Sequence, residues 1–169
     1  KNWTPFSDNG NLYYIYDLAK VQLLKMQDKL FSQDSEQQPV SWNFGELRGG
    51  CPPIKYGNNY IIFFHSSTNI TVRNTMGRQY HMGAMVIEGK YPYKPIAISK
   101  SPLMSGEKVS EYIQRLANII YVVFPSGVIK SENGYTISFG YNDYECRYVN
   151  VTNRHLQENL ISLVNEPLE

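Results

Sequence analysis

The sequence predicts an all-β protein built from antiparallel hairpins, and two observations point to this class. Aromatic residues are abundant, with 14 tyrosines, 7 phenylalanines and 2 tryptophans among 169 residues. Aromatic and β-branched side chains suit the pleated, half-buried surface of a sheet. Strand-like runs bounded by Gly, Asn, Pro or Asp also recur along the whole chain. These runs begin at residues 11, 59, 83, 94, 118, 134 and 146.

A repeated layout predicts how the hairpins associate. Three segments each combine a proline-marked first strand, a short turn and an aromatic-rich partner strand. Their shared positions are Pro5 and Tyr13, Pro53 and Tyr60, and Pro125 and Tyr135. Because an isolated hairpin is only marginally stable, repeated hairpins must pack together, and the radial solution is a β-propeller. We therefore expect antiparallel propeller blades in a single domain over residues 1–169.

Helix is expected to be a minor part of the fold. The run "VSEYIQRLANII", from residue 109, is compatible with a helical turn that leads into a strand. The run from residue 153 places Leu156 and Leu160 near helical spacing, with Asn153 as the expected cap, and so allows a short C-terminal helix. The polar run "DKLFSQDSEQQPVSW", from residue 28, is expected to be a loop.

Composition excludes several functional classes. A formal net charge of +1 gives no broad basic surface for nucleic acid. The longest apolar runs, about five or six residues, fall far short of the ~20 that a membrane-spanning helix needs. Cys51 and Cys146 lack the spacing of a metal site and are interpreted as reduced thiols. No metal is expected, and a cytoplasmic location is slightly favoured.

Four ordered motifs resemble those of one enzyme family. They are "KNWTPF", "GGCPPIKYGNNYIIFFHS", "YHMGAMVIEGKYPYKPIAISKSPLM" and "IIYVVFPSGVIKSENGYTISFGYND". The chain resembles the five-bladed β-propeller glycoside hydrolases, specifically the mannoside phosphorylases and β-mannosidases of family 130. Since a blade takes ~40 or more residues, the resemblance implies about three blades from the C-terminal portion of the propeller. The other blades would lie on an upstream segment or on a second chain.

The resemblance implies roles for four side chains. It places Arg48, where the family usually has Lys, and His65 at a phosphate and substrate site, and it places Asp143 and Tyr80 in the substrate pocket. Guanidinium suits oxyanions, and the two glycines after Arg48 permit close approach of a ligand. The residues alone leave simpler readings open, namely a salt bridge from Arg48, a hydrogen-bonded core histidine and an ordinary turn aspartate.

Other polar residues are weaker candidates. Asp17 and Glu46 are carboxylates near the expected site, and Glu46 is close enough in sequence to pair with Arg48. His81 is expected at the surface or in a supporting position. In the resembling family the general acid is an aspartate of an earlier blade, so the catalytic residue is expected upstream and is not assigned here.

The sequence therefore predicts a glycoside phosphorylase or hydrolase acting on mannosides or related glycans. Its ligand would be a carbohydrate or a sugar phosphate, with inorganic phosphate as a co-substrate and no cofactor. Two alternatives remain open at this point: a glycosyltransferase on the same scaffold, and a propeller that binds sugar without catalysis.

Overall fold

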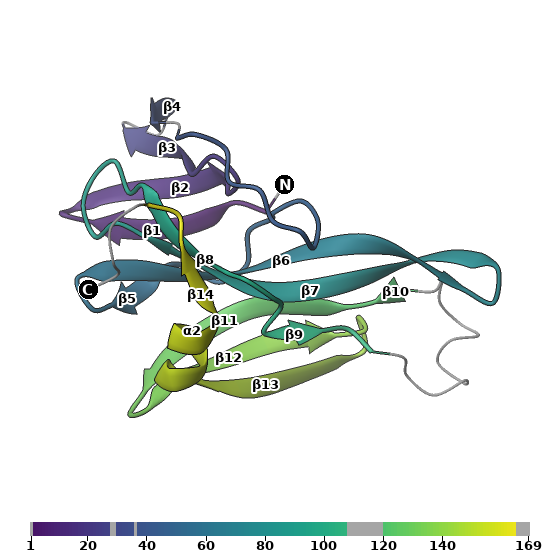
Figure 1. Ribbon diagram of the computed structural model, residues 1–169. Helices are drawn as coiled ribbons and strands as arrows, with labels where there is room; N and C mark the ends of the chain where they lie inside the picture. The colour runs from purple at the N-terminus through teal and green to yellow at the C-terminus, as the bar shows by residue number, and fades with distance from the viewer. Residues whose placement is uncertain (1, 28–29, 36, 108–119, 165–169) are drawn as a thin grey trace.

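The chain forms three β-sheets, and the second of them also takes in a strand from residues 160–162, which follow the third sheet in sequence (Figure 1). The computed structural model describes residues 2–27, 30–35, 37–107 and 120–164. Strand pairing among these residues is antiparallel, except for one short parallel pair. The expected helical turn from residue 109 falls on residues 108–119, outside the described part.

The first sheet has four strands in sequential order. They are β1 (Thr4–Asp8), β2 (Asn11–Asp17), β3 (Gln22–Gln27) and β4 (Leu30–Ser35). Asn9 and Gly10 join β1 to β2 with φ values of 48° and 77°, as a tight hairpin turn requires. A loop was expected from residue 28, and this prediction is wrong for the residues of β4. They form a strand because they pair with β3, although their polar sequence does not indicate one.

A long hairpin forms the centre of the second sheet. The strands of this sheet are β5 (Ile54–Tyr56), β6 (Asn59–Val72), β7 (Thr75–Ile87), β8 (Pro95–Ser99), β9 (Met104–Ser105), β10 (Ile120–Tyr121) and β14 (Leu160–Ser162). Strands β6 and β7 pair continuously from Tyr60 opposite Ile87 to Val72 opposite Thr75. Strand β6 runs past His65 to Val72, because its polar second half still pairs with β7.

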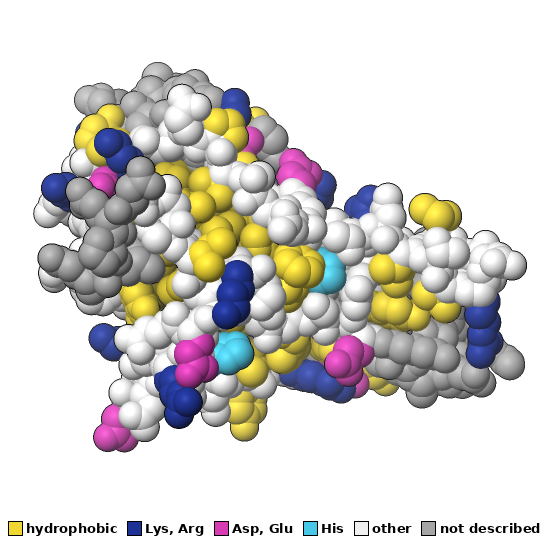
Figure 2. Space-filling view, viewed as in Figure 1, with side chains coloured by type: hydrophobic (Ala, Val, Ile, Leu, Met, Phe, Trp, Pro, Cys, Tyr) yellow, Lys and Arg dark blue, Asp and Glu magenta, His cyan; other side chains and the backbone are white. Residues whose placement is uncertain are grey.

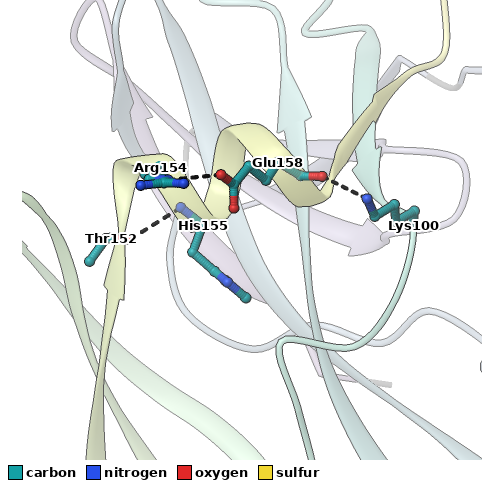
Figure 3. Close-up of polar contacts among 5 residues, drawn as sticks. All are labelled: Lys100, Thr152, Arg154, His155 and Glu158. Atoms are coloured by element: carbon teal, nitrogen blue, oxygen red, sulfur yellow. Dashed lines mark hydrogen bonds and ion pairs between the residues drawn. The ribbon is translucent and has the colours of Figure 1, made fainter.

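The third sheet and a short helix complete the fold. The sheet contains β11 (Val123–Ser131), β12 (Gly134–Tyr141) and β13 (Glu145–Thr152), and helix α2 (Asn153–Asn159) follows. The expected helix is present, but its cap is Thr152 rather than Asn153, since the Thr152 side chain accepts a hydrogen bond from the His155 amide. Figure 3 shows Lys100 donating to the Glu158 carbonyl, which ties α2 to the segment after β8.

The three hairpins predicted from the repeated layout are confirmed. They are β1–β2, β5–β6 and β11–β12. Their shared tyrosines, Tyr13, Tyr60 and Tyr135, are all buried. The hairpins therefore contribute both their strands and their aromatic residues to the interior.

Two hydrophobic cores lie on opposite faces of the β6–β7 hairpin. Side chains alternate between the two faces of a strand, so Ile62 and Phe64 enter the core shared with the first sheet. Ile61 and Phe63 enter the core shared with the third sheet. The hairpin thus separates the core shared with the first sheet from the core shared with the third sheet.

Asp8 links the first two sheets. The Tyr60 hydroxyl donates to one carboxylate oxygen at 2.9 Å, and the Tyr93 hydroxyl donates to the other at 2.6 Å. The hydrogen bond from Tyr93 is the main cause that lowers the pKa of Asp8. The rings of Tyr60 and Tyr93 also pack around Phe6 of β1.

The surface carries no single-sign charged patch on the face shown in Figure 2, where acidic and basic side chains are interspersed. Hydrophobic side chains gather near the centre of this view, between the first and third sheets. Both cysteines are free thiols, as expected, with Cys51 buried and Cys146 exposed. Within the described ranges, no helix is long and apolar enough to cross a membrane, and no cluster of three or more His, Cys, Asp or Glu forms a metal site.

Candidate functional site

A backbone bridge brings Arg48 and His65 side by side. The Arg48 amide donates to the His65 carbonyl at 2.9 Å, and the His65 amide donates to the Arg48 carbonyl at 3.1 Å. Residues directly opposite each other in antiparallel strands project toward the same face. The chain turns at the Cys-Pro-Pro corner and returns along β6, so the backbones of Arg48 and His65 lie opposite each other.

The two glycines after Arg48 serve the packing of the chain itself. A Cβ atom on Gly49 would collide with the Asn2 carbonyl and the Thr4 hydroxyl. A Cβ atom on Gly50 would collide with the Phe63 carbonyl. The space beside these glycines, which was expected to admit a ligand, is thus filled by the chain around β1 and by β6. These contacts fix the position of the backbone beside Arg48.

His65 is held in one tautomer. It is only 3% exposed, and its Nδ1 lies 2.7 Å from the Gly49 carbonyl oxygen. A carbonyl can only accept, so Nδ1 carries the proton and Nε2 is the ring atom left for a ligand. Burial is the main cause that lowers the pKa of His65, and the nearby charge of Arg48 lowers it further, while the Gly49 hydrogen bond opposes both.

Aromatic rings flank the imidazole of His65. The Tyr80 ring stacks nearly parallel to it at 5.9 Å between centroids, and Phe124 of β11 lies at 4.6 Å. Tyr80 therefore lies beside His65, and the role of both residues in substrate binding stays a prediction. The contact with Phe124 joins the third sheet to the candidate site, and sequence reasoning missed it.

A surface hollow lies beside Arg48. Its lining includes Tyr16 and Asp17 from the end of β2, with Glu46, Leu47 and Arg48. The Arg48 side chain is 43% exposed, and its guanidinium forms an ion pair with Glu46 at 2.9 Å. Tyr16 and Leu47 were not predicted, although the position of Tyr16 next to Asp17 at a strand end was an available signal.

Asp143 lies in a tight turn between β12 and β13. Its φ is 54° and that of Asn142 is 53°, and the Tyr144 amide donates to the Tyr141 carbonyl across the turn. Asp143 is exposed and does not line the hollow beside Arg48. Asn142 fastens the turn to Val122, because its side-chain oxygen accepts from the Val122 amide at 2.7 Å.

His81 occupies the opposite face of the hairpin. It pairs with Ser66, the residue after His65, so the alternation of the strand turns it away from His65. Its two ring nitrogens contact the hydroxyls of Thr68 and Ser105 at 2.9 and 2.8 Å. The side chain is 5% exposed, so a surface position is wrong, and its contacts give it a structural role.

Comparisons with known proteins agree with this architecture. A beta-1,2-mannobiose phosphorylase from Listeria innocua superposes with a TM-score of 0.62 at 22% identity, over 94% of this chain and 46% of its own. A glycosyl hydrolase from Bacteroides ovatus gives a TM-score of 0.59 at 15% identity, over 91% of this chain and 49% of its own. These likenesses confirm the propeller fold class, and the chain spans about half the length of these structures.

Sequence comparison identifies the family. No curated protein matches the chain. The family model of glycoside hydrolase family 130, described as beta-1,4-mannooligosaccharide phosphorylase, matches residues 12–162. That match covers most of the chain and contains every side chain of the expected site. The chain therefore belongs to glycoside hydrolase family 130.

Proposed function

We propose that this chain forms part of a mannoside phosphorylase or hydrolase, with Arg48 and His65 at its oxyanion and substrate site. The observation that carries the proposal is the backbone bridge between these residues inside the segment matched by the family model. A similar fold is present in a beta-1,2-mannobiose phosphorylase. Nothing in the comparisons supports the glycosyltransferase alternative.

In phosphorolysis, an oxygen of inorganic phosphate attacks the anomeric carbon of the mannoside. The bond between that carbon and the glycosidic oxygen breaks, and the leaving oxygen takes a proton from a general acid. In hydrolysis, water replaces phosphate and needs a general base. Resemblance to the family places the acid on another blade, so we assign Asp143 and Tyr80 to substrate contacts rather than to proton transfer.

Arg48 and His65 would hold the anion in different ways. The Arg48 guanidinium is always charged and offers several N–H donors. The His65 imidazole reaches a ligand through Nε2, because Nδ1 is held by Gly49. Neutral Nε2 accepts a hydrogen bond, whereas protonated Nε2 donates one to an oxyanion. Phosphate binding should therefore favour protonated His65.

The rest of the propeller is part of the proposal. Solved structures of similar fold are about twice as long as this chain. We assign the remaining blades, and the general acid with them, to an upstream segment or a second chain. Closing the propeller would also cover sheet edges that otherwise invite association.

The test combines product analysis with binding. The protein, together with the segment or chain that supplies its remaining blades, is incubated with β-1,2- and β-1,4-mannobiose with and without phosphate, and mannose 1-phosphate and mannose are quantified. Calorimetric titration of each mannobiose, phosphate and mannose 1-phosphate is repeated with Arg48→Ala, Arg48→Lys and His65→Ala. We expect Arg48→Lys to retain more phosphate affinity than Arg48→Ala. Lysine keeps the positive charge but cannot form the two parallel hydrogen bonds of a guanidinium.

The possible results separate the candidate functions. Mannose 1-phosphate that forms only with phosphate supports a phosphorylase, and mannose that forms in its absence supports a hydrolase. Sugar binding without turnover would support a binding protein. If no mannoside or mannose 1-phosphate binds, or if the alanine variants bind like the unmodified protein, the proposed site is refuted.

A further inference from the structure

Glu46 lies where an anion would have to approach Arg48. Its carboxylate is 2.9 Å from Nη2 of Arg48, and both side chains reach the surface, with 43% of Arg48 and 73% of Glu46 exposed. Both residues line the same hollow, so the guanidinium that faces this hollow already holds a negative partner. A ligand anion must share that guanidinium with the carboxylate or displace it.

The charge within the hollow also opposes an anion. Its lining includes one guanidinium, from Arg48, and two carboxylates, from Asp17 and Glu46. A phosphate that enters this space meets two like charges and one opposite charge. A neutral sugar does not experience this repulsion, and its hydroxyl groups can donate hydrogen bonds to the carboxylates.

We propose that Glu46 is a specificity-determining residue that competes with phosphate for Arg48 and thereby shifts the site from phosphate toward neutral ligands. The inference rests on the proposed function, because it takes Arg48 as the anion-binding group. Exposed ion pairs contribute little to stability, so the Glu46 carboxylate can be displaced. Glu46 therefore lowers the affinity of Arg48 for phosphate without preventing phosphate from binding.

The size of the effect follows from the exposed character of the pair. Such pairs are worth ~0.2–1 kcal/mol, which corresponds to an affinity change of about 1.4- to five-fold. Glu46→Gln keeps the size of the side chain and removes its charge. We expect this variant to bind phosphate about 1.4- to five-fold more tightly, without a matching gain in mannobiose affinity, since a neutral sugar is not repelled by the Glu46 carboxylate.

The chain contains a matched control for this substitution. Glu145 and Arg147 form an exposed ion pair with the same two-residue spacing, at 2.6 Å. It lies on β13, and neither residue lines the hollow. Glu145→Gln changes the net charge of the protein as Glu46→Gln does, so it reports any general effect of charge on phosphate binding.

The experiment is calorimetric titration of inorganic phosphate into the unmodified protein, Glu46→Gln, Glu145→Gln, Arg48→Ala and the double variant Arg48→Ala with Glu46→Gln. Tighter binding by Glu46→Gln alone, including binding gained where the unmodified protein shows none, supports the proposal. Unchanged or weaker binding by Glu46→Gln overturns it. An equal gain in phosphate affinity with Glu145→Gln also overturns it. So does a gain from Glu46→Gln that persists in the Arg48→Ala background.

A parallel titration with mannobiose keeps this inference distinct from the proposed function. If mannobiose binds and Glu46→Gln leaves phosphate affinity unchanged, only the role of Glu46 is lost. If neither mannobiose nor mannose 1-phosphate binds any of the proteins, the proposed function itself fails. In that case a change in phosphate affinity would still report on Arg48 and Glu46 as an anion site.

Discussion

Removal of the Tyr93 hydroxyl should weaken the link between the first and second sheets. The Tyr93→Phe substitution deletes the 2.6 Å hydrogen bond to Asp8 and keeps the aromatic ring. That ring still packs against Phe6 and Tyr13, with centroids 5.2 and 5.7 Å away. The change therefore isolates one hydrogen bond to a carboxylate.

The expected loss of unfolding free energy is about 1 kcal/mol. A hydrogen bond to a charged group contributes ~1.5–3 kcal/mol, but water can reach Asp8 and replace part of the lost interaction. Asp8 also keeps its hydrogen bond from Tyr60. The loss should therefore fall below the usual range for charged partners.

The effect should depend on pH in a defined direction. The pKa of Asp8 is lowered in the folded protein, so its contribution is present above the unfolded pKa of ~3.9 and is lost as pH falls through the folded value. Urea unfolding at neutral pH should separate Tyr93→Phe from the unmodified protein, and the difference should shrink at a pH of about 3 or below.

An exposed tyrosine provides the control for this measurement. Tyr148 is 72% exposed, so Tyr148→Phe should leave the unfolding free energy within ~0.5 kcal/mol of the original. If Tyr93→Phe is as stable as this control at neutral pH, the proposed link contributes nothing. An equal loss at both pH values would show that ionised Asp8 is not its cause.

Two further predictions concern the central hairpin. A Cβ on Gly83 would lie 2.5 Å from the Phe64 ring, so Gly83→Ala should cost ~1–3 kcal/mol in urea unfolding, whereas Gly140→Ala, whose Cβ meets nothing closer than 4.0 Å, should cost much less. Similar losses would contradict the packing argument. Sulfate, whose charge stays constant near neutrality, should bind more weakly as pH rises through the lowered pKa of His65. Titration of sulfate should show this dependence lost in His65→Ala, and a pH dependence that survives in that variant would exclude His65 as its source.

The sequence predicted the parts of the fold that have a strong local signal. The three proline-marked hairpins were found because aromatic residues and turn residues alternate there. Strand β4 was missed, since Leu30–Ser35 has no alternating apolar pattern and pairs through its backbone with β3. The full extent of β6 has no local signal for a related reason, because its apolar run ends before the strand does.

The candidate site was predictable in its residues more than in its geometry. The strand pattern and the resemblance singled out Arg48 and His65, and the structure joins them by a backbone bridge that no local pattern encodes. The tautomer of His65 depends on the Gly49 carbonyl, whose position follows from packing against β1. The ligand contact expected for Asp143 stays a prediction, and the structure places this residue in an exposed turn.

The two faces of the β6–β7 hairpin pack into different cores, and this has a consequence for how such a chain can evolve. Deleting one residue between Tyr60 and His65 would exchange the two faces, sending Phe64 toward the wrong core and His65 away from Tyr80. We therefore expect this part of β6 to tolerate no insertion or deletion of a single residue, and to accept only changes of two residues at a time. Among the described residues, Ile70–Gly77 form a ribbon that pairs only with itself, so the tip is where insertions and deletions can accumulate while both cores keep their partners.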